Sequence, residues 1–225
     1  MISTLYKAFR FFRGAFLFVI LNLFQHLLLF TQELPVKTTI NAEPQSLYDN
    51  DLLPKEFHAG RRNALRNLMG DSTVAVFFAS TLKNRSNDVN YEFHQDPNFY
   101  YMTGLREPDA MLVVFKNEIQ FDGFSGNEIL FLKEKELKLE RWAGKLLGVD
   151  GAKSTLGIQN AFSAESFSES KLDFSKFKNV YFFEQKKENE SDLQKQFSKK
   201  QITNADTYSI KELMAALREI KTKEE

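Results

Sequence analysis

The sequence predicts an α/β fold, in which a largely buried sheet lies between helices and follows an apolar N-terminal segment. Three runs rich in β-branched and aromatic residues lack polar alternation, as is typical of strands buried on both faces. They are Ser72–Ser80, Ala110–Lys116 and Glu128–Lys133, and Asn179–Glu184 is a further strand candidate. A polar connection around Gly123 and Gly126 is expected to join the second and third runs. Stretches of helical periodicity lie between some of the runs, which indicates a layered α/β architecture.

The first helix is expected to begin at Pro54, because proline fits the first turn, where its missing N–H would be unpaired in any case. Gly70 is a natural stop. The apolar residues between them recur on one face at helical spacing: Phe57, Ala64, Leu65, Leu68 and Met69. Further helices are expected around Lys135–Leu147 and Ser163–Leu172. Residues 185–200 are almost wholly polar, which favours a solvated helix or a surface excursion.

The C-terminal stretch 209–225 predicts one more amphipathic helix. Ser209 and Glu212 have the spacing of a capping box, in which the two side chains pair with free backbone N–H groups. Apolar residues then recur with helical periodicity: Ile210, Leu213, Met214, Leu217 and Ile220. Since neither glycine nor proline follows, the helix is expected to run to Glu225 and to lead into a further domain. In such a severed domain, its apolar face would be exposed.

The N-terminal region resembles an export signal. Residues 1–13 carry Lys7, Arg10 and Arg13 but no acidic residue, and the apolar run Ala15–Phe30 follows them. Three readings remain open for residues 1–32: a cleaved signal peptide, an uncleaved membrane anchor through residues 14–30, or a start codon placed too early. The first two predict an exported or membrane-anchored protein, and the third a cytoplasmic one. Residues 33–53 lack periodicity and are expected to form a linker.

Composition excludes several classes of function. The formal net charge is +0, so nothing indicates electrostatic capture of nucleic acid. The absence of cysteine excludes disulfides, thiolate nucleophiles and cysteine metal sites. The three histidines, His26, His58 and His94, lack the close spacing of a zinc motif.

The segment FHQDPNFYYMTG, residues 93–104, carries the pattern that most resembles a reacting centre. His94 and Asp96 could form a general base with an orienting carboxylate, but no nucleophile or metal site accompanies them in the sequence. We therefore expect an architectural role, in which Gln95 and Asp96 fix a turn and Gly104 permits a bend. The aromatic residues between them would fill space: Phe99, Tyr100 and Tyr101.

Three blocks together resemble the N-terminal domain of aminopeptidase P (Xaa-Pro aminopeptidase), which prolidase and creatinase share. They are EFHAGRRNALRNLM (56–69), NRSNDVNYEFHQDPNFYYMTGLREPDAMLVVF (84–115) and ERWAGKLLGVDGAKSTLGI (140–158). The resemblance covers about three-quarters of the chain, from Pro54 to Lys223. It implies a ribonuclease-H-like mixed sheet flanked by helices over 54–208. It also implies that the helix at 209–225 leads to a separate "pita-bread" catalytic domain, which binds two manganese ions.

The resemblance also implies roles for individual residues. Trp142 stands where the family presents an aromatic wall to the substrate cleft, although a core position is the alternative. Arg85 and Asp88 would order a loop at this cleft, with Asp88 near the substrate amine, or else form a surface ion pair. Lys145 and Leu146 replace two family arginines, so a bidentate contact by that pair is not expected. The same comparison places Gln95, Asp96, Phe99, Tyr101 and Gly104 in the structural signature of the family.

Three functions are compatible with these residues. The first is the N-terminal portion of a metal-dependent Xaa-Pro aminopeptidase, which shapes the cleft and the homo-oligomer. Its partners would be a catalytic domain or subunit and proline-containing peptides. It would have no catalytic or metal-binding residue of its own. The alternative is a free-standing, exported, non-catalytic module that binds a peptide or partner through the surface around Trp142. An independent hydrolase using His94 is the third reading.

Overall fold

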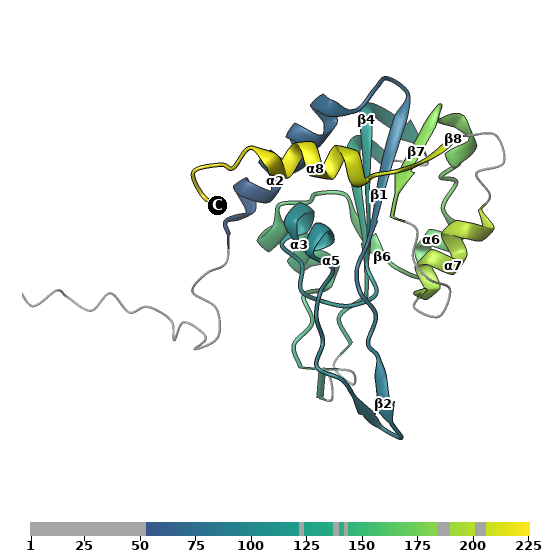
Figure 1. The fold of residues 1–225 in the computed structure, drawn as a ribbon. Helices are drawn as coiled ribbons and strands as arrows, with labels where there is room; N and C mark the ends of the chain where they lie inside the picture. The colour runs from purple at the N-terminus through teal and green to yellow at the C-terminus, as the bar shows by residue number, and fades with distance from the viewer. Residues whose placement is uncertain (1–52, 122–123, 137–139, 142–143, 184–189, 201–205) are drawn as a thin grey trace, which may run out of the picture. The chain divides into compact units, whose positions relative to one another are not determined.

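The computed structural model describes residues 53–121, 124–136, 140–141, 144–183, 190–200 and 206–225. Residues 51–225 form one compact unit by themselves (Figure 1). The export signal or anchor, the linker up to residue 52 and Trp142 lie outside the described residues. Within the described part of the chain, no helix is both long and apolar enough to pass through a lipid bilayer.

The unit alternates helices and strands as expected from the sequence. Its principal helices are α2 (Lys55–Leu68), α3 (Pro97–Thr103), α5 (Gly148–Gly151), α6 (Ser166–Glu169), α7 (Asp192–Lys199) and α8 (Lys211–Glu219). A π-helical turn (Ala152–Leu156) and a 3-10 turn (Phe174–Lys176) complete them. The strands are β1 (Thr73–Phe78), β2 (Asn84–Ser86), β3 (Val89–Asn90), β4 (Met111–Phe121), β5 (Phe124–Leu132), β6 (Ala161–Ser163), β7 (Asn179–Phe182) and β8 (Asp206–Ser209).

Six strands form one mixed sheet in the order β6-β5-β4-β1-β7-β8, which confirms the predicted fold class. Strand β4 is antiparallel to both β1 and β5. The pairs β1–β7, β5–β6 and β7–β8 are parallel. All six residues of β1 are buried, as its unbroken apolar sequence predicts for a central strand.

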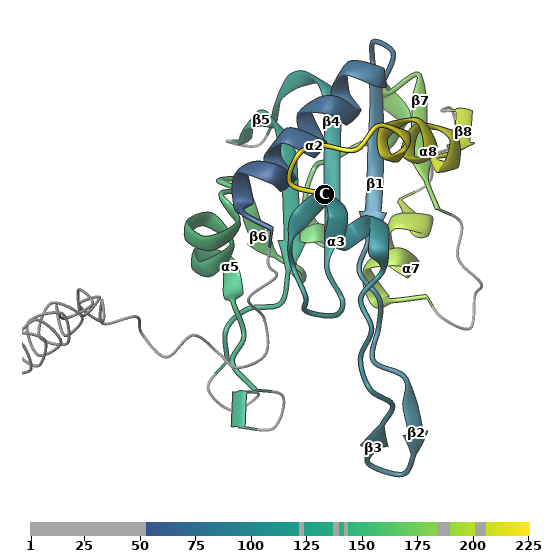
Figure 2. The same ribbon diagram turned by 60° about the vertical axis from the view of Figure 1, so that its left-hand side comes forward.

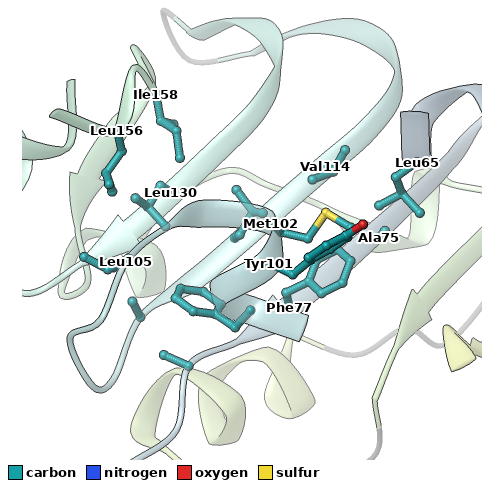
Figure 3. Close-up of a cluster of buried hydrophobic side chains, with 14 of the residues drawn as sticks. Leu65, Ala75, Phe77, Tyr101, Met102, Leu105, Val114, Leu130, Leu156 and Ile158 are labelled. Carbon is teal, nitrogen blue, oxygen red and sulfur yellow. The ribbon is translucent and has the colours of Figure 1, made fainter. Parts of the chain in front are cut away.

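Helices cover both faces of the sheet (Figures 1 and 2). One face packs against α2, α3, α8 and the turn after α5, and Figure 3 shows part of this cluster, including Leu65, Phe77, Met102 and Val114. The opposite face packs against α6 and α7 through residues such as Val76, Phe115, Phe167 and Phe197. Because successive strand residues point to opposite faces, β1 and β4 supply both clusters.

The central hairpin is longer than its apolar runs. Strands β4 and β5 pair from Met111–Phe131 to Phe121–Phe124, so Gly126 lies inside β5 opposite Ile119 rather than in the connection. Gly126 has φ of 154°, and a Cβ there would lie 2.7 Å from the Asn160 amide nitrogen. The polar ends of both strands were missed because backbone pairing extends a hairpin beyond its buried residues.

Two predicted helices are confirmed only in part. Of the helix expected over Lys135–Leu147, Glu140 and Arg141 are helical, whereas residues 135–136 and 144–147 are not, and Gly144 has φ of 83°, outside the right-handed helical region. A separate short helix, α5, follows from Gly148 to Gly151. The helix expected over Ser163–Leu172 is confined to α6. Ser163, the first residue of the predicted helix, belongs to the edge strand β6.

The polar stretch 185–200 is more than a solvated segment. Its described residues include α7, which has a complete capping box between Ser191 and Gln194. Leu193 and Phe197 of this helix are 4% and 2% exposed, and both belong to the core. Two apolar residues one turn apart are enough to dock a short helix, although the average polarity concealed them.

The final helix, α8, differs from its prediction at both ends. Ser209 belongs to β8, and Ile210 is the N-cap without a side-chain cap bond, so the expected capping box of Ser209 and Glu212 is absent. The helix ends at Glu219 rather than at Glu225. Its face is not exposed: Ile210, Met214 and Leu217 are buried in the core, and only Ile220 of the predicted apolar series is largely exposed, at 79%. Leu68 of α2, also in the predicted apolar face, is 47% exposed.

Candidate functional site

The turn that precedes α3 is fixed by the side chains of Gln95 and Asp96. The Asp96 carboxylate accepts hydrogen bonds from the N–H groups of Asn98 and Phe99, at 2.9 and 2.8 Å, and so caps the helix. Pro97 follows as the first helical residue, which has no N–H to satisfy. His94 is exposed, and the Asp96 carboxylate is turned toward the backbone of α3.

The Gln95 amide links three segments. Its oxygen accepts the Ser80 N–H at 2.8 Å, at the end of β1. Its nitrogen donates to the carbonyl oxygens of Leu105 and Glu107, at 3.2 and 2.8 Å. The side chain thus links the start of α3 and the connection between α3 and β4 to Ser80, just after the end of β1.

Helix α3 contacts the buried His58 through the ring of Tyr100, whose centroid lies 5.6 Å from that of the imidazole. Phe99 is fully buried and Tyr101 is 7% exposed. The Nδ1 atom of His58, in α2, lies 3.0 Å from the Tyr101 carbonyl oxygen. Gly104 ends α3 with φ of 74°, and a Cβ there would lie 2.8 Å from the His58 ring. Glycine is therefore required at this position both for its backbone conformation and for the space it leaves.

Arg85 and Asp88 lie on a hairpin that projects from the unit. Strands β2 and β3 form this hairpin, and Figures 1 and 2 show it extending away from the sheet. Both side chains are exposed. The turn is held by Asn84, whose amide donates to the carbonyl oxygens of Asn87 and Val89 at 2.8 and 3.3 Å.

The hairpin and its flanks also expose apolar side chains that were not singled out from the sequence. Leu82, Val89 and Tyr91 are 45%, 52% and 58% exposed. They are close in sequence but do not follow the period of a buried strand, so only the projection of the hairpin identifies them as surface residues. Apolar groups grouped on a projecting element are typical of a contact surface.

The connection between β5 and α5 extends from the same end of the unit in its described parts (Figures 1 and 2). Trp142 lies outside the described residues, while Lys145 is exposed. The Leu146 N–H donates to the Glu140 carboxylate at 3.0 Å, and the Leu147 N–H donates to the Glu107 carboxylate at 2.5 Å. The first bond lies within the connection, and the second ties its described end to the segment between α3 and β4.

Charged residues gather between these two projections. Lys133 pairs with Asp109 at 2.6 Å, and Lys135 pairs with Glu140 at 3.7 Å. Burial raises the pKa of Glu107, and the nearby charge of Glu140 adds to this effect. The Asp109–Lys133 pair also lines a surface pocket of about 490 Å³ at the root of the hairpin.

A second charged group was not predicted as important and lies in the core. Arg62 is 1% exposed, and its guanidinium donates to Glu128 at 2.9 and 3.1 Å and to the Met102 carbonyl oxygen at 2.8 Å. Arg66 adds a further bond to Glu128 at 3.0 Å. Burial alone would raise the pKa of Glu128, but the two guanidinium groups more than offset it, so this pKa is lowered. The spacing of Arg62 and Arg66 by one helical turn was the available signal.

The described residues offer no group of three or more histidine, aspartate or glutamate side chains placed to hold a metal ion. Fold and site thus define a mixed α/β domain with projecting loops and, in the residues described, no metal centre. Residues 58–181 match the family described as "Aminopeptidase P, N-terminal domain". Since this match spans more than half of the chain, the chain belongs to that family.

Two similar curated proteins are named Xaa-Pro aminopeptidase. Xaa-Pro aminopeptidase of Haemophilus influenzae is 37% identical over 116 residues, which is 52% of this chain and 26% of that protein. Xaa-Pro aminopeptidase of Escherichia coli is 36% identical over 103 residues, which is 46% of this chain and 22% of that protein. The chain thus spans about a quarter of the length of these relatives.

Solved structures of aminopeptidase P also resemble this chain. Aminopeptidase P from E. coli with the inhibitor Pro-Leu matches with a TM-score of 0.64 at 25% identity, over 77% of this chain and 40% of that one. A putative aminopeptidase P from Bacillus anthracis matches with a TM-score of 0.62 at 25% identity, over 77% of this chain and 42% of that one.

Proposed function

We propose that the chain is the substrate-shaping N-terminal portion of a metal-dependent Xaa-Pro aminopeptidase. The complete enzyme would remove the N-terminal residue that precedes proline, and this portion would take no part in the chemical step. One observation carries the proposal. In a chain of this family, the two blocks that resemble the family's cleft residues, around Arg85–Asp88 and Glu140–Leu147, extend from the same end of the unit.

The two projections suit the recognition of a short peptide. Asp88 would stand near the substrate amine, and Arg85 would help to order the hairpin. Trp142 would supply a flat apolar wall for the proline ring, because an aromatic side chain buries a large area with little loss of conformational entropy. Peptides that lack proline at the second position would pack poorly against such a wall.

The metal chemistry would belong to a separate catalytic domain. The family resemblance implies two manganese ions, and paired metals activate water and stabilise the charge that develops on a scissile carbonyl. The described residues of this chain do not fit such a centre, because they lack a suitable group of ligands. We therefore assign no step of the reaction to them.

The C-terminal residues support a connection to that domain. The Thr222 N–H donates to the Glu225 carboxylate at 3.0 Å, which is the hydrogen bond that a glutamate makes in a capping box at the start of a helix. Glu225 also lies 4.0 Å from Arg61 of α2, and Arg218 lies over the Tyr101 ring. These contacts would fix the direction of the chain after α8.

The proposal extends to assembly and location. The exposed apolar residues Leu82, Val89 and Tyr91 suit burial against the catalytic domain or a second subunit, in line with a homo-oligomer. The basic residues before the apolar run at 15–30 support export or membrane anchoring.

The test is hydrolysis of an Xaa-Pro peptide by the purified chain with added manganese, alone and mixed with a separately expressed catalytic domain of a relative. We expect no hydrolysis from the chain alone, and faster or more selective hydrolysis on mixing. Asp88→Asn should reduce that gain, whereas Asp71→Asn, another exposed aspartate outside the hairpin, should not.

Each alternative has its own outcome. Activity of the chain alone, lost in His94→Gln, would support an independent hydrolase and contradict the proposal. No gain on mixing, together with binding of a proline-containing peptide by the chain alone, would instead support a free-standing binding module.

A further inference from the structure

Among the described residues of the connection between β5 and α5, Leu147 is held by a carboxylate from a distant part of the unit. Glu107 lies in the connection between α3 and β4, 40 residues before its partner, and its Oε1 atom accepts the Leu147 N–H at 2.5 Å. Hydrogen bonds to a carboxylate are generally stronger than those between neutral groups. The next residue, Gly148, has φ of 64°, and a Cβ there would lie 2.9 Å from the Lys135 side chain. The backbone therefore turns sharply next to the contact.

The backbone of Glu107 is itself held by a hydrogen bond from Gln95. The Gln95 amide donates to the Glu107 carbonyl oxygen at 2.8 Å, and Gln95 is fixed in turn by the Ser80 N–H. The segment that carries the Glu107 carboxylate is thus tied through Gln95 to the end of the β1 segment and to the start of α3. Glu140 repeats the arrangement locally, because its carboxylate accepts the Leu146 N–H at 3.0 Å.

Burying the Glu107 carboxylate costs free energy. Its Oε2 atom is buried and has no hydrogen-bond partner among the described residues. Burial raises the pKa of Glu107, as does the negative charge of Glu140, while the Leu147 N–H and Lys133 lower it. Nearby, Lys135 pairs with Glu140, and Lys133 pairs with Asp109. Because burial disfavours the charged form, stability alone does not account for the glutamate.

We propose that Glu107 is a positioning residue, whose carboxylate holds the segment Gly144–Gly148 against the connection between α3 and β4. Through this segment it sets the position of one wall of the peptide cleft, and that last step rests on the proposed function. The hydrogen bonds of Gln95 connect the Glu107 segment to the turn before α3. Through Glu107, that turn is therefore linked to the projection after β5.

Hydrogen exchange of the backbone amides tests the anchoring directly in the full-length chain. Glu107→Ala removes the acceptor, so the amides of Leu146 and Leu147 should exchange roughly tenfold faster, the factor expected for loss of a bond to a charged group. Glu107→Gln keeps an acceptor oxygen and should restore most of the protection. The matched control is Glu118→Ala, which removes an exposed carboxylate that accepts the Ser125 hydroxyl at 2.9 Å in the same β4 hairpin.

The only tryptophan of the sequence supplies a second measurement, because Trp142 precedes this segment by two residues. The emission of Trp142 should titrate with a midpoint above the ordinary glutamate range in the wild-type chain, and this titration should be absent in Glu107→Gln. Acrylamide quenching of the same emission should increase in Glu107→Ala and stay unchanged in Glu118→Ala.

The outcomes separate anchoring from general stability and from the proposed function. Unchanged exchange at Leu146 and Leu147 in Glu107→Ala would overturn the proposal, as would equally faster exchange in α2 and β1. In the mixed assay, Glu107→Ala should raise KM with little change in kcat. If the wild-type chain gives no gain on mixing, the proposed function fails, while the exchange data still decide whether Glu107 anchors the segment.

Discussion

Gly104 shows how a single residue sets the geometry of the signature turn. Its left-handed conformation ends α3, and the space beside it is filled by the ring of His58. The bend was predictable from glycine followed by a new apolar run, since glycine adopts positive φ without strain. The contact with His58 was not, because the two residues are separated by α2, β1 and the projecting hairpin.

Gly104→Ala is expected to destabilise the domain by about 2 kcal/mol or more, because the new Cβ is strained at this φ and overlaps the His58 ring. Gly60→Ala provides a control of opposite sign. Gly60 lies inside α2 with no atom within 4 Å of its missing Cβ, so alanine should stabilise the helix by ~0.5–1 kcal/mol. Urea unfolding of both variants measures the two changes, and equal effects would contradict the steric argument.

At the scale of elements, the ion group of Arg62, Arg66 and Glu128 fastens α2 to β5. The two guanidinium groups approach one carboxylate, and Arg62 also bonds the Met102 carbonyl oxygen in α3. Helix α7 shows the reverse case, in which apolar residues within a polar sequence are buried. Leu193 and Phe197 bury it in the second core cluster although the surrounding sequence is polar.

Glu128→Gln should destabilise the domain by roughly 3 kcal/mol, because it leaves the buried charge of Arg62 without its partner. Glu118→Gln, at an exposed position of β4, should change stability by less than about 0.5 kcal/mol. Chemical denaturation in water–urea mixtures at neutral pH provides the comparison. A small effect of Glu128→Gln would mean that Arg62 finds other acceptors once the carboxylate is gone.

At the scale of the whole molecule, the buried His58 makes stability depend on pH. Burial lowers the pKa of His58 from its ordinary value of 6.5; the charge of Arg62 adds to the lowering, while the contact with the Tyr101 carbonyl opposes it. The unfolded chain therefore binds this proton more readily than the folded chain does. The contribution of neutral His58 is complete above pH 6.5 and is lost as the pH falls from there toward the lowered value.

The melting temperature of the wild-type chain should accordingly fall between about pH 7 and pH 5.5. His58→Asn cannot take up this proton, so its melting temperature should change less over that range. His94→Gln is the matched control, because His94 is exposed and its replacement should leave the wild-type slope intact. An identical slope in His58→Asn would assign the acid sensitivity to other groups. A further loss at lower pH is expected from Glu128, whose lowered pKa means that protonation removes its ion pairs.

The sequence by itself determined the family, the mixed α/β fold, the central strands and the capped turn at Gln95 and Asp96. These features depend on local rules, namely unbroken apolar strands, helix-compatible periodicity and residues with specific turn geometry. The motif blocks also localised the predicted cleft residues to two short segments.

Only the tertiary structure decided which of the remaining residues work together. The pairing of Arg62 with Glu128, the packing of His58 against Gly104 and the bond from Leu147 to Glu107 each join residues at least 40 positions apart. The start of α8 was likewise set by strand pairing, because Ser209 pairs with Phe182 in the sheet. Such contacts depend on how the chain returns on itself, and the one-dimensional pattern of polar and apolar residues does not encode that return locally.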